Sequence, residues 1–356
     1  MRRGRAAFSR GMLRQCLLPA LLFPGRESGT IDGACIGDPD AGVKSIGGAV
    51  QMGGIVILGV FVADVAFQAK RQPKIGETLF GSRFALGPGG KGSNQAVAAA
   101  RLGSDVSFLS RLGDDEFGRM ARSLWKNEGI RPLAASDPDD PTGAAYIYVD
   151  EQTGDNAIIV VPGAAGNICI TDLESHRDAI SGASLFMTQL ETSVETAHHG
   201  LEIARTSGVT TILNPAPAAP IGAETLALCD YLIPNETETE ALTGAGIKSV
   251  GDAAAAAAAL RDLSGGTAII TLGENGAFFD DGRRQCHIEA FNFGKTVETT
   301  GAGDSFCGAL AHALTQGFEP IEASRFACAA ASISVTRHGT APAMPTAAEM
   351  KGFFRT

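Results

Sequence analysis

The residues best suited to chemistry form a glycine-rich turn over positions 299–304 (TTGAGD), followed by an apolar helix predicted over residues 306–314. Small residues allow backbone N–H groups to converge on an anion at a helix start, where the helix dipole also favours negative charge. A carboxylate at the mouth of such a turn can take a proton from a hydroxyl that attacks phosphorus. The pattern suits phosphoryl transfer to an alcohol, although a lone glycine-rich turn more often only reverses the chain.

A second glycine cluster spans residues 87–94 (GPGGKGSN), between a strand-like run and a predicted helix. It matches the dinucleotide fingerprint G-x-G-x-x-G literally, but the preceding strand belongs to a predicted hairpin and Pro88 adds a rigidity that the fingerprint does not require. A Walker A loop is excluded, because its first glycine and the Ser or Thr after Lys91 are both missing. The cluster can bring Lys91 and Asn94 to a polyhydroxylated ligand, or it can simply begin a helix.

The composition indicates the size class of the molecule and its partners. The 356 residues are 44% hydrophobic and 19% charged, which allows one large domain or two smaller ones with a sizeable core. The formal net charge is −10 and no long basic run follows the first residues, which argues against a nucleic-acid partner. A polyanion such as ATP would therefore need backbone amides, a few cations and a metal ion at its site.

The seven cysteines are scattered singly along the chain. No C-x-x-C pair and no Cys/His ligand spacing is present in the sequence, so neither a zinc site nor a disulfide framework is indicated. This usage fits a reducing, cytoplasmic setting. The adjacent histidines His198 and His199 point in different directions on a helix, which favours a surface pair over a metal site.

The first 51 residues differ from the remainder. Five arginines precede an apolar stretch over residues 16–23 that Pro19 interrupts, a crude match to a signal or transit peptide. This stretch is too short to span a membrane. Residues 29–48 are rich in Gly, Asp and Ala without periodicity, and Met52 directly precedes the first strand. We interpret residues 1–51 as a disordered extension or a misassigned start, and residues 52–350 as the folded domain.

Short apolar runs alternate with helical patterns from residue 53 onward. Repeated pairing of this kind predicts an α/β fold, with a mainly parallel, doubly wound sheet that carries helices on both faces. Strands are expected over residues 55–60, 106–110, 185–187, 210–213, 231–233 and 268–272, and helices over 93–102, 117–128, 194–206, 236–242 and 252–263.

Two stretches interrupt this alternation. Residues 78–86 and 144–161 contain strand-like runs without intervening helices. Antiparallel hairpins inserted into an α/β domain would form a small separate sheet, with strands from about 61–87 and 143–163. Such a sheet can serve as a lid over ligands at the carboxyl ends of the strands, or as a dimerisation surface.

Taken together, these motifs resemble the ribokinase family of sugar kinases over about residues 53–347. The resemblance rests on residues 89–96 (GGKGSNQA), 214–218 (NPAPA), 234–238 (PNETE), 271–273 (TLG) and 301–304 (GAGD). It implies an ATP-dependent kinase that favours the 5-hydroxyl of D-ribose, needs Mg²⁺ and K⁺, and forms a homodimer. Three alternatives stay open: a related kinase for another sugar, one for a nucleoside, and a non-catalytic sugar-binding protein on the same fold.

The resemblance also implies residue roles. Asp304 would be the base, and Gly301, Ala302 and Gly303 would supply N–H groups to the transferring phosphoryl. Sugar binding would fall to Asp64, Gly89, Gly90, Lys91, Asn94 and Glu191, with Asp304. Nucleotide binding would fall to Asn235, Thr271, Leu272, Gly273, Glu274, Asn275, Gly276, Gly303 and Cys328.

Two ion sites follow from the same resemblance. Asn235 and Glu238 would lie near Mg²⁺ and act through water, since Mg²⁺ retains waters readily. The alternative for Glu238 is a plain acid in the first turn of its helix. A monovalent-cation site would comprise Glu298, Thr300, Ser334, Arg337, Gly339 and Ala343, mainly through backbone carbonyls.

Three positions depart from the family pattern. Val62 stands where an Asn usually precedes the sugar-binding Asp64, so one sugar hydroxyl loses an amide partner and discrimination can change by orders of magnitude. Glu298 replaces the usual Asp, which keeps the charge but reaches further. Ala343 replaces a common serine at the cation site.

Overall fold

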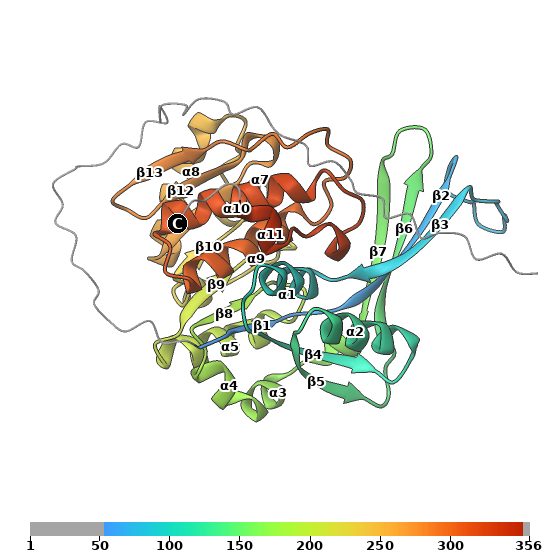
Figure 1. Cartoon of the computed structure of the whole chain (residues 1–356), viewed down its shortest axis with the longest axis horizontal. Helices are drawn as coiled ribbons and strands as arrows, with labels where there is room; N and C mark the ends of the chain where they lie inside the picture. Colours follow the sequence, from blue (N-terminus) through green and yellow to red (C-terminus); the bar gives the residue numbers. More distant parts are fainter. Residues whose placement is uncertain (1–52, 352–356) are drawn as a thin grey trace, which may run out of the picture. The chain divides into compact units, whose positions relative to one another are not determined.

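The computed structural model describes residues 53–351 of the chain (Figure 1). The predictions made for residues 1–51 lie outside this part.

A nine-stranded sheet forms the centre of the described domain, in the order β13-β12-β11-β10-β9-β8-β1-β4-β5. Each pair from β11 to β5 in this order is parallel, whereas β12 and β13 are antiparallel to their neighbours, so the predicted mainly parallel sheet is confirmed. The strands are β1 (Ile55–Leu58), β4 (Val106–Gly113), β5 (Arg131–Asp137), β8 (Leu185–Thr188), β9 (Thr210–Leu213), β10 (Tyr231–Leu232), β11 (Thr267–Thr271), β12 (Ala277–Asp280) and β13 (Gln285–Ile288).

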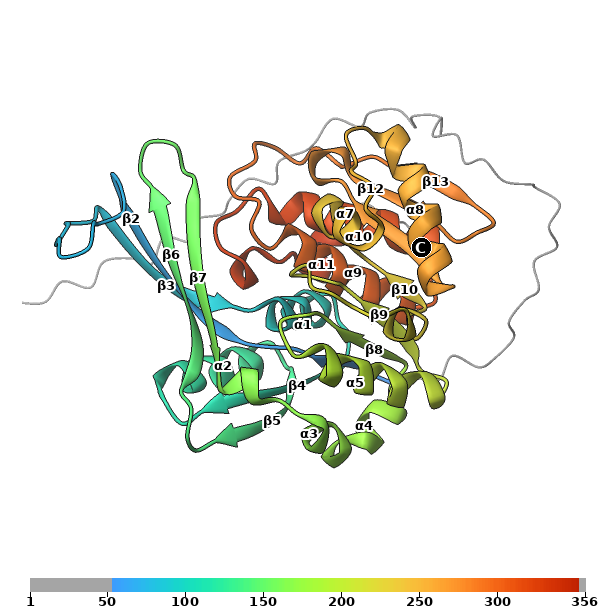
Figure 2. The same ribbon diagram turned by 180° about the vertical axis from the view of Figure 1, so that it is seen from behind.

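Helices cover both faces of this sheet, as the sequence predicted (Figures 1 and 2). In the interior strand β1, Ile55 and Ile57 pack into one core cluster while Val56 and Leu58 pack into the other, which explains why the whole strand is apolar. The first cluster includes α1 (Lys91–Arg101), α2 (Glu116–Asn127), α9 (Ala302–Thr315), α10 (Pro320–Ser334) and α11 (Ala347–Met350). The second includes α3 (Ile170–Ser175), α4 (Arg177–Ser181), α5 (Val194–Thr206), α6 (Ala223–Leu226), α7 (Glu236–Thr243) and α8 (Val250–Ser264).

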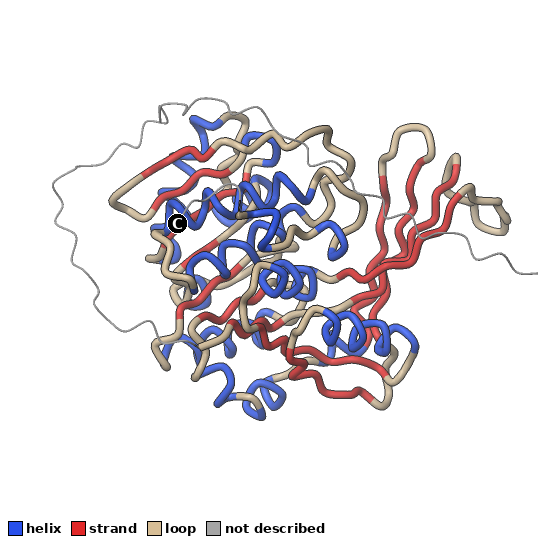
Figure 3. The backbone as a smooth tube through the Cα atoms, in the orientation of Figure 1, coloured by secondary structure: helices blue, strands red, loops and turns tan. Residues whose placement is uncertain are grey.

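A separate four-stranded sheet, hereafter the small sheet, has the order β3-β2-β6-β7 (Figure 3). Its strands are β2 (Val62–Ala69), β3 (Arg83–Gly89), β6 (Thr142–Asp150) and β7 (Asn156–Gly163). The prediction of a separate small sheet is therefore confirmed. The strand run expected from residue 78 begins only at Arg83, and β3 continues to Gly89, so the glycine cluster itself pairs with Val62.

Side chains of β2 alternate between two faces of the small sheet, because successive residues of a strand point in opposite directions. Asp64, Ala66 and Gln68 line a cavity on one face, and Val62 shares their parity. Phe67 lies on the other face, where its ring contacts those of Phe84 and Tyr146. The small sheet therefore has a cavity face and an outer face.

Two features of the chain differ from the sequence-based expectations. Helix α9 begins at Ala302 rather than at residue 306, because Gly301 adopts a left-handed conformation (φ 83°) and serves as the N-cap. Asp304 therefore lies inside the first helical turn. Strands β5, β12 and β13 and helices α3, α4, α6, α10 and α11 were not predicted; β13 alternates half-buried and buried residues and so forms no continuous apolar run.

Within residues 53–351, no helix is both long enough and apolar enough to cross a lipid bilayer.

Candidate active site

Asp304 is a buried carboxylate in the first turn of α9, with 7% of its surface exposed. Its Oδ2 atom accepts from Asn94 Nδ2 at 3.0 Å and its Oδ1 atom from Gln95 Nε2 at 3.2 Å. Burial raises the pKa of Asp304, while Lys91, Asn94 and Gln95 act in the opposite direction. The predicted base is thus held in one orientation by two amides from α1.

The backbone before Asp304 opens towards solvent. Gly303 is exposed, and a Cβ there would meet no atom within 4 Å, whereas a Cβ at Gly301 would lie 3.3 Å from Thr340. The first amides of a helix have no acceptor inside the helix, which suits an anion. Of the three predicted donors, the Ala302 N–H already donates to Thr299 O at 3.2 Å.

Lys91 begins α1 directly after Gly90, whose positive φ (89°) turns the chain from β3 into the helix. The Lys91 backbone N–H donates to Glu191 Oε2 at 2.8 Å. Burial lowers the pKa of the Lys91 ammonium, but the carboxylates of Asp304, Glu191 and Glu238 outweigh this and raise it. A protonated lysine therefore lies among three carboxylates that come from distant parts of the sequence.

The two further predicted sugar ligands, Asp64 and Glu191, are acids with raised pKa values. Burial, together with Asp304 and Glu298, raises the pKa of Asp64 to about 6. Burial raises the pKa of Glu191 to about 7, although Lys91 lowers it. A Cβ at Gly89 would clash with the Asp64 carboxylate, so a glycine at this position makes room for it.

A cavity of about 510 Å³ lies against the cavity face of the small sheet. Its lining includes Asp64, Gly87 and Pro88 from the small sheet, and Glu298, Thr300 and Gly339 from the loops around α9 and α10. Thr340 Oγ1 donates to Pro88 O at 2.9 Å and so joins the two sides. Of the predicted sugar residues, Asp64 lines this cavity.

The predicted nucleotide residues form a second group at the carboxyl ends of β10 and β11. Asn235 pairs with Thr271 in an isolated parallel bridge, and Thr271 N donates to Pro234 O at 2.9 Å. Gly273, Glu274 and Asn275 are exposed in the 3₁₀ turn η2 (Gly273–Asn275). Leu272 is buried and Gly276 is half-buried, and Leu272 N donates to Gly276 O at 2.8 Å.

Cys328 lies apart from this group in sequence and packs inside α10, where only 3% of its surface is exposed. Burial raises the pKa of its thiol to about 12. A thiol in this environment stays neutral, so its side chain can offer only van der Waals contact.

Asn235 and Glu238 form a capping box at the start of α7. Asn235 Oδ1 accepts from Glu238 N at 2.9 Å, while Glu238 Oε2 and Oε1 accept from Asn235 N at 2.9 Å and Nδ2 at 3.1 Å. Among the described residues no group of three or more His, Cys, Asp or Glu side chains is arranged to hold a metal. The pair fits Mg²⁺ only through water, with the phosphates of a nucleotide supplying direct ligands.

Of the predicted monovalent-cation residues, Glu298, Thr300 and Gly339 line the cavity against the small sheet. The Oε2 atom of Glu298 accepts from Gly339 N at 3.0 Å and lies 3.5 Å from His338 Nδ1. Ser334 Oγ donates to Ala331 O within its own helix, and the Arg337 side chain pairs with Glu349. The Ser334 and Arg337 side chains are thus already engaged, so a cation here would depend on Glu298 and on backbone carbonyls. K⁺ needs only oxygen ligands, which these groups can offer.

The site prediction did not include three buried amide side chains that are linked to Asp304 by hydrogen bonds. Gln95 and Asn214 lie in the recognised motifs but received no role, and Gln189 follows β8 directly. Their positions in the sequence could have identified them. Polar residues at the carboxyl end of a parallel strand, or next to a glycine turn, lie near the ligand site of an α/β sheet.

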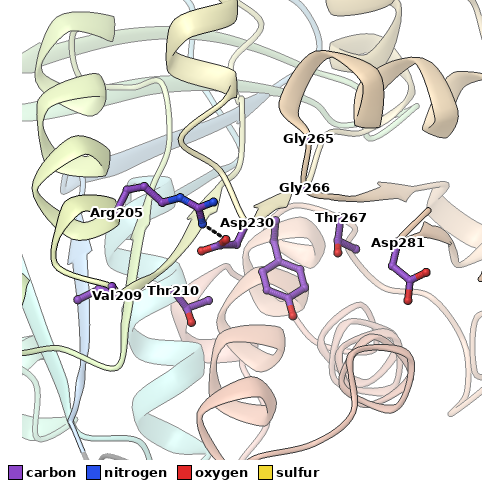
Figure 4. A pocket seen from close by; sticks show the side chains of 10 residues that line it. Arg205, Val209, Thr210, Asp230, Gly265, Gly266, Thr267 and Asp281 are labelled. Carbon is purple, nitrogen blue, oxygen red and sulfur yellow. Dashed lines mark hydrogen bonds and ion pairs between the residues drawn. The ribbon is translucent and has the colours of Figure 1, made fainter. Parts of the chain in front are cut away.

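A second cavity, of about 620 Å³, lies at the opposite, amino-terminal ends of β9, β10 and β11 (Figure 4). An ion pair between Arg205 and Asp230 lies in its wall, beside Thr210 and Tyr231. None of the predicted site residues lines this cavity.

Comparison with known proteins bears on the identity of the chain. Residues 52–347 match the model of the family described as pfkB family carbohydrate kinase. A ribokinase of Haemophilus influenzae is 36% identical over 300 residues, covering 84% of this chain and 97% of the relative. A deoxyribokinase of Salmonella typhi is 35% identical over 294 residues, covering 82% and 95%.

The fold agrees with these sequence matches. The structure of an Arabidopsis thaliana ribokinase complexed with ribose and ATP superposes with a TM-score of 0.78 at 30% identity, covering 84% of this chain and 98% of that one. The matches extend over both sheets and over every motif that surrounds Asp304, and the chain therefore belongs to the pfkB family of carbohydrate kinases.

Proposed function

We propose that this carbohydrate kinase transfers the γ-phosphoryl group of ATP to the 5-hydroxyl of D-ribose. The observation that carries the proposal is the buried Asp304 carboxylate, held by Asn94 beside the Lys91 ammonium and next to an open helix start. The ribokinase relatives and the structure with ribose and ATP support this choice of substrates. The kinase domain would extend over residues 52–350, with the lid strands at about 61–87 and 143–163.

In the proposed reaction, Asp304 accepts the proton of the sugar hydroxyl while its oxygen forms a bond to the γ-phosphorus. The bond from that phosphorus to the β,γ-bridging oxygen breaks, and ADP leaves with the electron pair. Negative charge on the transferred group would be stabilised by Lys91 and by N–H groups of Gly301–Gly303, of which the Ala302 N–H would first have to leave Thr299 O. The products are ribose 5-phosphate, ADP and the proton held by Asp304.

Sugar binding would use the carboxylates of Asp64 and Glu191 and the amide of Asn94. Asn94 Oδ1 is buried and has no hydrogen-bond partner among the described residues, so it can accept from a sugar hydroxyl. Asp64 and Glu191, once ionised, accept strong hydrogen bonds from further hydroxyls. Gly89 and Gly90 leave room for the protein itself, because a side chain at Gly89 would clash with the Asp64 carboxylate and one at Gly90 with Val60 O.

Two cations belong to the proposal. Mg²⁺, when bound with ATP, neutralises phosphate charge, and Asn235 and Glu238 would hold its waters. K⁺ would be bound by Glu298 and the carbonyls around Gly339, from which it would stabilise the loop before α9. Residues 271–276 would contact the adenosine, with Cys328 contributing packing only.

A second candidate substrate is 2-deoxy-D-ribose, and Val62 favours it. Val62 is 3% exposed and shares the cavity-face parity of Asp64, two residues further along β2. An apolar side chain there cannot hydrogen-bond a hydroxyl, so a sugar that lacks one leaves no polar group unpaired. The deoxyribokinase relative is consistent with this alternative.

The proposal includes a homodimer in the cytoplasm. The outer face of the small sheet exposes large apolar side chains, among them Phe84 at 58% and Ile159 at 64%. Exposed apolar groups gathered on one sheet face are typical of an interaction surface, and a second copy presents an identical face. The free cysteines of the described residues suit a reducing compartment.

A coupled ADP-release assay over pentoses, hexoses and nucleosides tests the proposal. We expect turnover with ribose or 2-deoxyribose to exceed that with hexoses and nucleosides by at least about tenfold in kcat/KM. Phosphorylation of a nucleoside in preference to both pentoses would refute the assignment, and the absence of turnover with every sugar would favour a binding protein.

A further inference from the structure

The proposed base is one end of a chain of buried amide side chains. Gln95 Nε2 donates to Asp304 Oδ1 at 3.2 Å and to Asn214 Oδ1 at 3.3 Å. Gln95 Oε1 accepts from Gln189 Nε2 at 2.5 Å. Gln95 is fully buried, Gln189 is 1% exposed and Asn214 is 9% exposed. These amides therefore support the carboxylate from beneath, on the side away from solvent.

The charge on Asp304 sets the orientation of each amide in the chain. An ionised carboxylate only accepts hydrogen bonds, so Gln95 must turn its NH₂ group towards Asp304. The Gln95 carbonyl then faces Gln189, which must present its own NH₂ group. Asn214 Nδ2 donates to Ile233 O at 2.7 Å, which leaves Asn214 Oδ1 for the second Gln95 proton. A flipped amide would leave buried donors facing each other.

Two glycines make room for this chain. A Cβ at Gly59 would lie 2.5 Å from Gln189 Oε1, and a Cβ at Gly92 would lie 2.9 Å from the same atom. The Gln189 side chain is thus enclosed between the end of β1 and the start of α1. Its enclosure restricts the Gln95 carbonyl and, through it, the amide that contacts Asp304.

We propose that Gln95 is a positioning residue for Asp304: its amide, held by Gln189 and Asn214, keeps the carboxylate in the orientation that receives the substrate proton. This inference rests on the proposed role of Asp304 as base. Asn94 differs from Gln95, because its Oδ1 atom has no partner among the described residues and can accept a hydrogen bond from the sugar while Nδ2 donates to Asp304.

Several charged or titratable groups interact with Asp304 besides these amides. Lys91 on α1 lowers the pKa of Asp304, and Asp304 in turn raises the pKa values of Asp64 on β2, Glu191 after β8, Glu238 on α7 and Cys307 on α9 itself. Loss of the Gln95 donor leaves these interactions in place and removes one bond that favours the charged form of Asp304. The pKa of Asp304 would then rise, and a base that must be ionised would be lost at a higher pH.

The test compares three glutamine-to-methionine variants, each similar in length to the original side chain. Gln95→Met removes the donor to Asp304, and Gln189→Met frees the Gln95 carbonyl. Gln285→Met is the matched control, because Gln285 Nε2 donates to the buried Asp280 Oδ2 at 3.0 Å in β12–β13, away from the site. For each variant, kcat, sugar KM, the pH profile of kcat and the melting temperature would be measured with ATP and the sugar that the wild type uses best.

For Gln95→Met we expect kcat to fall about ten- to a hundredfold with little change in sugar KM, and the acidic limb of kcat to move up by about one pH unit. Gln189→Met should change both in the same direction but less, and Gln285→Met should change neither. If Gln95→Met keeps the wild-type kcat and the wild-type acidic limb, the inference is overturned. If Gln95→Met does not fold, Gln189→Met decides: a wild-type kcat and pH profile in that variant would overturn the inference.

Asp304→Asn separates failure of this inference from failure of the proposed function. Near-normal turnover in Asp304→Asn would refute the role of Asp304 as the base, and with it the proposed function. An inactive Asp304→Asn beside a fully active Gln95→Met would leave the base in place and refute only the positioning role.

Discussion

Asn94 Nδ2 donates to Asp304 Oδ2 at 3.0 Å, although the two residues are 210 positions apart in the chain. The contact joins the first turns of α1 and α9, the two helices that begin at the glycine clusters. Both helices pack on the same face of the large sheet, so their amino-terminal ends meet at its carboxyl edge. The meeting of these two helix starts creates the candidate site.

Replacing Asp304 by Asn should abolish most turnover while leaving the fold intact. The amide is similar in shape but cannot accept the hydroxyl proton, so we expect kcat to fall by about two to four orders of magnitude. Sugar KM should change much less. Steady-state kinetics with thermal melting would check this, and a variant that keeps more than about a tenth of wild-type kcat would contradict the role of base.

Replacing Val62 by Asn should shift selectivity towards ribose. The amide offers a donor and an acceptor on the cavity face, so kcat/KM for ribose relative to 2-deoxyribose should rise about tenfold or more. Val62→Thr, which has nearly the same volume, is the matched control and should give a smaller shift. An unchanged ratio in both variants would show that position 62 does not contact the sugar.

Glu191→Gln should stabilise the sugar-free enzyme increasingly as the pH rises from about 4.5 to about 7, and fully above that. The pKa of Glu191 is raised to about 7 in the folded chain from 4.5 in the unfolded one, so ionisation weakens folding as pH rises through this window. This difference between the two pKa values corresponds to about 3 kcal/mol in the free energy of unfolding at full ionisation. It is an upper value, because it assumes that the glutamine accepts the hydrogen bond from Lys91 N as well as the carboxylate does. Melting curves should coincide near pH 4 and separate at pH 8; a lower melting temperature for the variant at pH 8 would contradict this.

Activation by K⁺ should be present but modest. Glu298 engages Gly339 N and lies near His338, so its carboxylate is available to a cation only in part. We expect higher kcat in KCl than in choline chloride at equal ionic strength, and loss of this difference in Glu298→Gln. Equal wild-type rates in the two salts would exclude the monovalent-cation site.

The outer face of the small sheet should hold two copies together. Charges introduced by the pair Phe84→Asp and Ile159→Asp would be buried at a symmetric interface, so the variant should elute as a monomer in size-exclusion chromatography with light scattering. Ile75→Asp is the control, since Ile75 is fully exposed in the loop between β2 and β3. A monomeric wild type, or a double variant that stays dimeric, would contradict the proposed interface.

The sequence by itself determined the fold class, the family and the glycine turns. Apolar runs such as Ile55–Leu58 alternate with helical patterns, and this local periodicity is sufficient to predict a parallel sheet with helices on both faces. The sequence-based prediction placed the start of α9 too late. Gly301, the left-handed N-cap of this helix, is also a common residue in ordinary turns, so its type alone does not mark a helix start. Strands β12 and β13 were not predicted, although they are as long as β1; β13 alternates half-buried and buried residues and so forms no continuous apolar run.

Only the tertiary structure decided which polar residues act on Asp304. Gln95 comes from α1, Gln189 from the end of β8 and Asn214 from the end of β9, and no spacing in the chain links them. Their contacts arise because parallel strands and helix starts converge at one edge of the sheet, where burial requires each amide to find a partner. The raised pKa values of Asp64 and Glu191 have the same origin, since burial and mutual repulsion depend on distances that the sequence does not contain.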